Sequence, residues 1–310
     1  MSIALRANSL GSRLEAIQST LKSPTLALCL ATLFWSGSFV VARALREEID
    51  PIALTFLRWL ISLLVLAPFV WRQLAASTGV ILREWRLIVG LAASGIVLFH
   101  PLVFLALKYT TATSALLVFS LSPIAILLGA YLTGIQRPNR RQFSGVLVSM
   151  IGAGILITRG EMSVLTAAGF NIGDVWMVAA VVVWAIYSLL LRRRPEDLSQ
   201  TVTLVSSIAI ALPMLLPLLL LAPAGLIMTW SAPVLLGVGY IAVFASVAGF
   251  RFWSYGVAQL GPSRAGQFVH LMPLFGTALA FLFLGEPLAM QQILGAGFVL
   301  SGIVLIERRS

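Results

Sequence analysis

The fold is decided by a stretch of sequence that occurs twice. Residues 115–152 read ALLVFSLSPIAILLGAYLTGIQRPNRRQFSGVLVSMIG, and residues 265–302 read AGQFVHLMPLFGTALAFLFLGEPLAMQQILGAGFVLSG. Under a constant shift of 150 positions the two copies share Ala115 and Ala265, Leu121 and Leu271, Pro123 and Pro273, Ala130 and Ala280, Leu132 and Leu282, Gln142 and Gln292, Gly145 and Gly295, and Gly152 and Gly302. Trp35 and Arg43 match Trp184 and Arg192 at a shift of 149, so one deletion reconciles both registers. The chain is therefore an internal duplication.

The composition is that of a membrane protein. Of 310 residues, 59% are hydrophobic and only 10% are charged, and the mean hydropathy is +1.00. A spanning helix needs about 20 predominantly apolar residues. Ten such stretches are found, at residues 24–44, 51–71, 86–107, 111–133, 142–158, 174–191, 200–221, 232–256, 263–284 and 290–306. We therefore expect an all-α integral membrane protein with ten transmembrane helices.

The basic residues give the expected orientation. If the N-terminus is cytoplasmic, fifteen Lys and Arg residues fall on the inner side and four on the outer side, a strong positive-inside bias. The net charge of +10 is spread between the spans and not gathered on one face, so nucleic acid is not an expected partner. We expect a multi-pass protein of the bacterial inner membrane with both termini in the cytoplasm and the lipid bilayer around it.

The charges also predict that the two halves are inverted. The turn at residues 136–141 carries Arg137, Arg140 and Arg141, whereas the matching turn at residues 286–291 has no Lys or Arg. Loops that correspond in the repeat therefore face opposite sides of the membrane. The expected organisation is a cytoplasmic segment at 1–23, a first five-helix repeat at 24–158, an outer linker at 159–173, a second five-helix repeat at 174–307 and a cytoplasmic tail at 308–310.

Several short motifs occur in order along both halves: Phe34-Trp35-Ser36-Gly37-Ser38-Phe39, Phe56-Leu57-Arg58-Trp59, Ala106-Leu107-Lys108-Tyr109-Thr110-Thr111-Ala112, Pro273, Leu284-Gly285-Glu286-Pro287 and Gly295-Ala296-Gly297. Through these motifs the sequence resembles EamA-type proteins of the drug/metabolite transporter superfamily. The resemblance covers both halves, but Gly134-Ile135-Gln136 replaces the usual Gly-Glu pair in the first. The resemblance implies a central cavity, lined by spans one, three, four, six, eight and nine, that opens alternately to each side.

No enzyme signature is present. The sequence contains no His-Glu-x-x-His motif, no phosphate-binding loop and no Gly-x-Ser-x-Gly elbow, so we expect neither an enzyme nor a cofactor. The single cysteine, Cys29, and the two histidines, His100 and His270, are too few for a convincing metal site. Each histidine lies inside a span, which indicates either a cavity-facing role or a neutral histidine bonded to a carbonyl.

Candidate substrate-binding residues lie in the spans that the resemblance assigns to the cavity. Trp35 and Trp184 lead the set because the repeat places them across a shared centre. The candidates are Trp35, Ser38, Phe99, His100, Phe119, Trp184, Tyr187, Phe250 and His270. Arg58 lies about 10 Å into span two by helical rise, and we expect it to reach the outer headgroups or to pair with Asp50, although a guanidinium also suits a substrate carboxylate.

Prolines and carboxylates complete the prediction. Pro123 and Pro273 are symmetric, interrupt backbone hydrogen bonds inside spans four and nine, and are candidate hinges of alternating access. No Asp or Glu lies at the middle of a predicted span, which favours exchange or facilitated diffusion over coupling through a carboxylate. Asp174 is expected to cap the sixth helix.

The predicted function is secondary transport of a small organic metabolite as substrate, by export or exchange of amino acids or related compounds. A carrier for lipophilic drugs or sugars, a membrane enzyme, and an assembly subunit that does not transport stay as alternatives. The sequence leaves a homo-oligomer open.

Overall fold

The computed structural model describes residues 23–45, 48–110, 112–161, 163, 171–221, 231–284 and 289–307. The predictions for the N-terminal segment, the C-terminal tail and most of the linker lie outside these residues. The cytoplasmic placement of both termini therefore stays a prediction.

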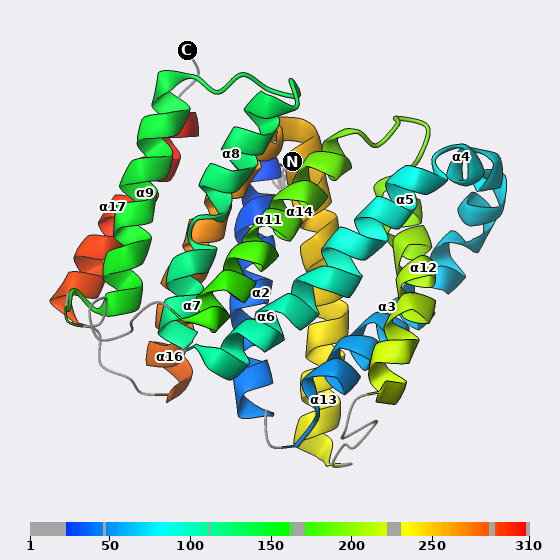
Figure 1. The fold of residues 1–310 in the computed structure, drawn as a ribbon, viewed down its shortest axis with the longest axis horizontal. Helices are drawn as coiled ribbons and strands as arrows, with labels where there is room; N and C mark the ends of the chain where they lie inside the picture. The colour runs from blue at the N-terminus through cyan, green and yellow to red at the C-terminus, as the bar shows by residue number, and fades with distance from the viewer. Residues whose placement is uncertain are drawn as a thin grey trace, which may run out of the picture.

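The first half forms five membrane-spanning elements (Figure 1). They are α2 (Pro24–Ala44); α3 (Pro51–Ala76); α5 (Trp85–Ala92), η1 (Ala93–Leu98) and α6 (Phe99–Tyr109) in one continuous span; α7 (Ala112–Phe119) and α8 (Ser122–Leu132) in another; and α9 (Arg140–Thr158). The short α4 (Thr78–Arg83) connects α3 to α5.

The second half repeats this order. Its elements are α11 (Ile172–Arg192); α12 (Gln200–Leu221); α13 (Ala232–Tyr240), η2 (Ile241–Gly249) and α14 (Phe250–Leu260); α15 (Pro262–Gln267), η3 (Phe268–His270) and α16 (Leu271–Leu284); and α17 (Met290–Glu307). Within the described chain, eight helices are long and apolar enough to cross a membrane and Met290–Leu305 is a shorter apolar helix. The remaining span is divided among α15, η3 and α16. The prediction of a ten-helix, all-α membrane protein is confirmed.

Several helices begin with signals that the sequence encodes locally. Ser23 and Asp50 cap α2 and α3, and each is followed by a proline in the first turn, where a missing N–H costs nothing. Asn139 and Asn171 form capping boxes with Gln142 and Asp174. Asp174 thus caps the sixth span as predicted, but from the third helical position, where it accepts a 3.0 Å hydrogen bond from the backbone N–H of Asn171.

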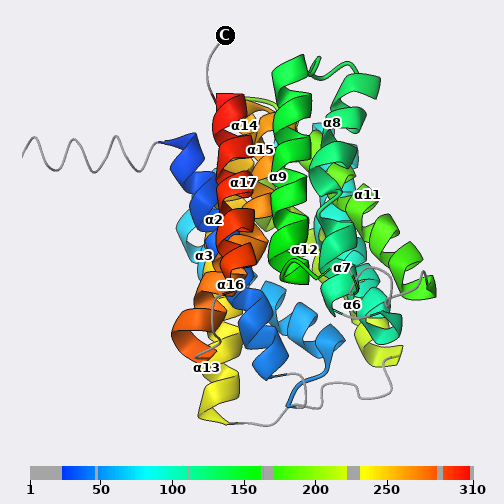
Figure 2. The ribbon, with the colours of Figure 1, turned by 90° about the vertical axis from the view of Figure 1, so that its left-hand side faces the viewer.

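The inversion of the two halves is visible where α9 packs against its repeat mate α17, at one edge of the bundle (Figures 1 and 2). A Cβ on Gly152 would lie 2.6 Å from the carbonyl oxygen of Gly295, and one on Gly302 would lie 2.6 Å from that of Gly145. Gly145 thus faces Gly302 and Gly152 faces Gly295, so residue numbers increase along α9 where they decrease along α17. The two helices are therefore antiparallel. Two repeat mates that run in opposite directions are the mark of an inverted repeat.

The ends of the bundle agree with this inversion. Gly261, which follows α14, lies close to Gln136, because a Cβ on Gly261 would be 2.7 Å from Oε1 of Gln136. Gly160 lies close to Gln291, because a Cβ on Gly160 would be 2.6 Å from Cγ of Gln291. Gln136 precedes α9 and Gly160 follows it. Gln136 and Gln291 therefore lie at opposite ends of α9.

Irregular backbone is also duplicated. The π-helical η1 covers residues 93–98, and the matching positions, 243–248, fall inside the π-helical η2. The interruption between α7 and α8, at Ser120 and Leu121, matches the end of the 3₁₀ turn η3 at His270. The symmetric prolines Pro123 and Pro273 follow these interruptions directly. π-Helical turns are often found at functional sites. In this protein they occur in two spans that contribute to the contact between the halves.

The glycine contact between α9 and α17 predicts a position-specific effect on stability. Replacement Gly152→Ala should lower the free energy of unfolding by about 1–3 kcal/mol, because the added methyl meets backbone atoms of α17. Gly154→Ala is the matched control, since nothing lies within 4 Å of its Cβ position, and it should not lower stability. Thermal unfolding of the purified protein in detergent measures both, and equal stability of the two variants would contradict the close packing.

Candidate substrate site

Aromatic side chains from both halves meet at the centre of the bundle. The Trp35 ring lies 5.2 Å from Trp184, 5.7 Å from Phe250 and 5.4 Å from Trp253, between ring centroids. Phe99 lies 5.1 Å from Trp184, and Trp59 lies 4.9 Å from Phe250. We call Trp35, Trp59, Phe99, Trp184, Tyr187, Phe250 and Trp253 the central aromatic cluster.

Most of the predicted wall residues belong to this cluster. The structure brings Trp35, Phe99, Trp184, Tyr187 and Phe250 together, and Phe119 touches Phe99 at 5.8 Å. Trp35 and Trp184 make an edge-to-face contact at an interplanar angle of 84°, a favourable geometry for aromatic pairs. The repeat predicts that these two mates lie across a shared centre, and in the structure their rings are in contact.

The cluster contains buried N–H donors that have no acceptor among the described residues. Trp35 donates from Nε1 to the carbonyl oxygen of Ala245 at 3.0 Å. In contrast, the Nε1 atoms of Trp59, Trp184 and Trp253 are buried and have no hydrogen-bond partner among the described residues. A buried N–H group without an acceptor costs roughly 1–3 kcal/mol, so three of them in one cluster favour a ligand that brings acceptors.

Arg58 points into the protein, and the expectation that it reaches the headgroups or pairs with Asp50 is wrong. Only 8% of Arg58 is exposed. Its Nε donates to Ser246 Oγ at 2.8 Å, its Nη1 lies 3.1 Å from His100 Nε2, and its guanidinium lies 5.3 Å from the Trp59 ring. Asp50 instead caps α3 through bonds from Ile52 and Ala53.

The position of Arg58 within span two is a signal in the sequence for an inward-facing arginine. A charged side chain deep in a span normally faces the protein interior or a cavity, and Arg58 is preceded by two full turns of apolar helix. The lining that the resemblance implies does not include span two, although this span supplies both Arg58 and Trp59. Which face of α3 turns inward depends on its packing against η2 and α12, which the sequence pattern does not show.

His100 acts as the acceptor for Arg58. A guanidinium can only donate, so His100 Nε2 is unprotonated and the proton lies on Nδ1, an assignment made from the hydrogen-bond network. The imidazole ring also lies 5.2 Å from Phe99 and 6.3 Å from Trp59. The predicted site residue His100 is therefore at the edge of the central aromatic cluster, in its neutral form.

His270 makes a different set of contacts. It is fully buried, its Nε2 lies 2.8 Å from the carbonyl oxygen of Ser120, and its Nδ1 lies 2.7 Å from Ser149 Oγ. Nε2 must donate to the carbonyl, so Nδ1 accepts from the hydroxyl. Both ring nitrogens are thus satisfied by protein groups, which agrees with a neutral structural histidine that joins η3 to the α7–α8 interruption and to α9.

The serines bond mainly to their own helices. Ser38, a predicted site residue, donates to the carbonyl of Trp35 at 2.7 Å, and Ser120 and Ser122 likewise bond to carbonyls three residues earlier. Ser36 is different, because its hydroxyl also reaches the carbonyl of Met272 at 3.1 Å. Ser36 therefore links α2 to α16 in front of Pro273, which the sequence did not predict.

The space beside the cluster is small. A cavity of about 10 Å³, roughly the room for one water molecule, lies next to Tyr187 and extends toward Arg194. Its other lining residues are Leu91, Ile96, Leu191, Gln200, Thr203, Leu204, Ser207 and Ser254. Within the described chain, no group of three or more His, Cys, Asp or Glu residues lies where it could hold a metal ion.

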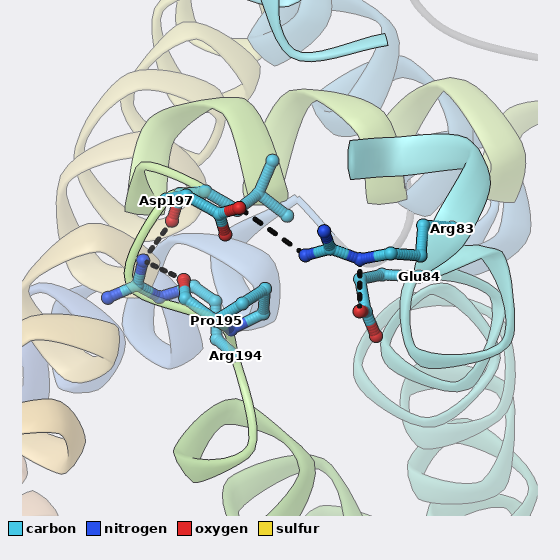
Figure 3. Close-up of polar contacts among 6 residues, drawn as sticks. Arg83, Glu84, Arg194, Pro195 and Asp197 are labelled. Carbon is cyan, nitrogen blue, oxygen red and sulfur yellow. Dashed lines mark hydrogen bonds and ion pairs between the residues drawn. The ribbon is translucent and has the colours of Figure 1, made fainter. Parts of the chain in front are cut away.

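Polar contacts join two loops at the end of the bundle toward which this cavity extends (Figure 3). Arg83 contacts Glu84 at 3.0 Å and, across the two halves, Asp197 at 3.3 Å. The hydrogen bond with Glu84 raises the pKa of Arg83. Arg194 donates to the carbonyls of Pro195 and Leu198, and partial burial lowers its pKa. Exposed ion pairs of this kind contribute little stability.

The comparison with protein families agrees with this architecture. The model of the EamA-like transporter family matches residues 22–158 and 171–308, one match for each half. The chain belongs to the EamA-like transporter family. It is therefore a multi-pass membrane transporter and not an enzyme, and the predicted resemblance is confirmed.

Named relatives cover nearly the whole of this EamA-like transporter. An "Uncharacterized transporter" of Archaeoglobus fulgidus is 28% identical over 90% of this chain and 96% of its own. A "Probable terminal-alkyne amino-acid exporter" of Streptantibioticus cattleyicolor is 25% identical over 92% and 93%. A "Probable amino-acid metabolite efflux pump" of Salmonella typhimurium is 25% identical over 89% and 92%. A crystal structure with 23% identity has the same fold, with a TM-score of 0.71 over 92% of this chain.

The contacts of His270 predict a role in stability. Replacement His270→Phe keeps a ring in place but leaves the carbonyl of Ser120 without its donor, which should lower the free energy of unfolding by about 1–3 kcal/mol. Ser149→Ala in the same background should add little, because the hydroxyl has already lost its contact with the imidazole and keeps only a bond to the carbonyl of Val146 in its own helix. Thermal unfolding of the two single variants and the double variant measures this coupling. Full additivity would contradict the assigned contact.

Proposed function

We propose that this transporter exports or exchanges amino acids or related small organic metabolites, by alternating access through the contact between its inverted halves. The observation that carries the proposal is the central aromatic cluster, which both halves build together and which contains three buried indole N–H groups without acceptors in the part of the chain that the structure describes. Two relatives whose printed names describe export of amino acids or their metabolites support the substrate class.

The chemistry of the cluster suits a substrate with one apolar group. Aromatic rings surround Trp184 on several sides and can cover an aliphatic or aromatic side chain. Among the described residues the cluster contains no carboxylate, so a multiply cationic substrate would enter without a counter-charge. An amino acid with an apolar side chain fits both conditions.

The inverted repeat supplies the two states that transport needs. Because each half can take the packing of the other, the chain has two nearly equivalent arrangements that open to opposite sides. In this proposal the small cavity beside Tyr187 belongs to the path toward the inner side, and Pro123 and Pro273 act as the symmetric hinges. The absence of a carboxylate from the described part of the centre favours exchange or facilitated diffusion.

The central cluster is tested by counterflow in proteoliposomes. Proteoliposomes that contain the wild-type protein and are loaded with unlabelled L-leucine or L-phenylalanine should take up the labelled amino acid from outside without a pH gradient. Replacement Trp184→Phe keeps an aromatic ring but removes one N–H donor, so KM should rise about 2- to 10-fold, as expected for one lost hydrogen bond. Trp71→Phe is the matched control, because Trp71 is largely exposed at the end of α3. An unchanged KM in Trp184→Phe would contradict the site.

The hinge proposal is tested at Pro273. Replacement Pro273→Ala allows the backbone hydrogen bond that proline prevents, so the interrupted span should stiffen and turnover should fall several-fold while thermal stability is kept or raised. Pro68→Ala in α3 is the control, since Pro68 lies inside a continuous helix. Counterflow rates at saturating substrate give turnover, and a Pro273→Ala rate equal to that of wild type would reject the hinge.

A further inference from the structure

A positive charge lies buried in this protein without a negative partner among the described residues. Arg58 stands about 10 Å along α3 from its outer end by helical rise, and only 8% of it is exposed. Among the described residues no carboxylate lies within the 4.0 Å of an ion pair from its guanidinium, because the recorded ion pairs are those of Arg83. A charge that has left water normally has a counter-charge, a cavity or a ligand beside it.

The protein contacts of Arg58 hold the guanidinium but do not neutralise it. Arg58 Nε donates to Ser246 Oγ at 2.8 Å, and Arg58 Nη1 donates to His100 Nε2 at 3.1 Å. Both acceptors are uncharged groups. These contacts use two of the five N–H donors of the side chain. The contacts come from η2 and α6, so the orientation of Arg58 is set by the two spans that contain π-helical segments.

The surroundings of Arg58 are also rich in donors. Trp59, whose ring lies 5.3 Å from the guanidinium carbon, has a fully buried Nε1 without an acceptor among the described residues. Among the described residues, Ser246 and His100 are the recorded side-chain acceptors of Arg58, and the guanidinium already occupies both. A site that offers a guanidinium and an indole N–H group is complementary to an oxyanion.

The apolar part of the site begins at Phe250, which contacts the Trp59 ring beside Arg58. Trp59 lies 4.9 Å from Phe250, and Phe250 lies 6.1 Å from Trp184. A small molecule with a carboxylate at one end and an apolar group at the other could therefore contact both parts at once, with its charged end on Arg58 and its apolar end on the rings.

We infer that Arg58 is the anion-recognition residue of the transporter and binds the carboxylate of an amphiphilic monocarboxylate, whose apolar group lies on Trp184 and Phe250. This inference rests on the proposed function and narrows it. Transport selects for the carboxylate, and molecules that keep the apolar group but lack the negative charge are poor substrates. Ser246 and His100 are positioning residues, because they act through Arg58.

The experiment compares acids with their amides. Wild type, Arg58→Gln and Arg58→Lys are reconstituted in liposomes, and counterflow is measured for L-phenylalanine and L-leucine and for L-phenylalaninamide and L-leucinamide, which differ from the acids at the carboxyl group alone. Wild type should prefer each acid by about 10-fold or more, the effect of a charge-assisted contact. Arg58→Gln should reduce the acid-to-amide ratio to about 1, and Arg58→Lys should keep part of the preference.

Controls separate recognition from folding. Arg251→Gln removes an exposed arginine from α14 and should leave the acid-to-amide ratio unchanged. If Arg58→Gln does not elute as a folded protein in size-exclusion chromatography, Ser246→Ala replaces it, since this variant keeps the charge but removes the acceptor at Nε. It should raise KM for the acids several-fold and leave that for the amides unchanged.

The outcomes are distinct. A wild type that moves acids and amides equally well, or an Arg58→Gln variant that keeps the full acid preference, would overturn the role of Arg58 while the proposed transport function stands. A wild type that moves neither acids nor amides would reject the proposed function and this inference with it.

Discussion

Lipid offers no hydrogen-bond partner to a backbone carbonyl, and this constraint accounts for the position of the irregular segments of the protein. The carbonyls of Ala242 and Ala245 in η2 accept from Ser62 and Trp35, the carbonyl of Met272 accepts from Ser36, and that of Ser120 accepts from His270. Each of these bonds joins the first half to the second. Broken and widened helices are therefore tolerated where one half satisfies the backbone of the other, and the same requirement keeps the halves together.

The repeat mates meet one another along this contact. Trp35 packs on Trp184, Ser120 binds His270, and the glycines of α9 face those of α17. The symmetry is incomplete where the chemistry is most specific, because the position that matches His100 is Phe250, and the two rings contact Trp59 from different spans. A polar end and an apolar end of one site can thus arise from two copies of the same span, through substitution in one of them.

Sequence reasoning predicted the architecture well because its signals are strong and local. Apolar length fixes the spans, the arginines of the 136–141 turn indicate the inversion, and the shift between Trp35 and Trp184 predicts their contact. It failed at Arg58, because snorkelling and burial both agree with an arginine at that depth, and the choice depends on how α3 is rotated. The π-helical segments were also missed, since η1 and η2 contain ordinary apolar residues such as Ile96 and Val247 that have no local signal for a wider turn.

The contact between α9 and α17 has a consequence for how the duplicated halves can diverge. Each glycine in this contact leaves room that the backbone of the other helix occupies, so a larger residue on one side requires a smaller one, or a displaced helix, on the other. The two copies are consequently not independent modules that could be exchanged with those of another carrier. Sequence drift in either copy is limited by the shape of its own inverted twin, however freely the lipid-facing residues of the same helices change.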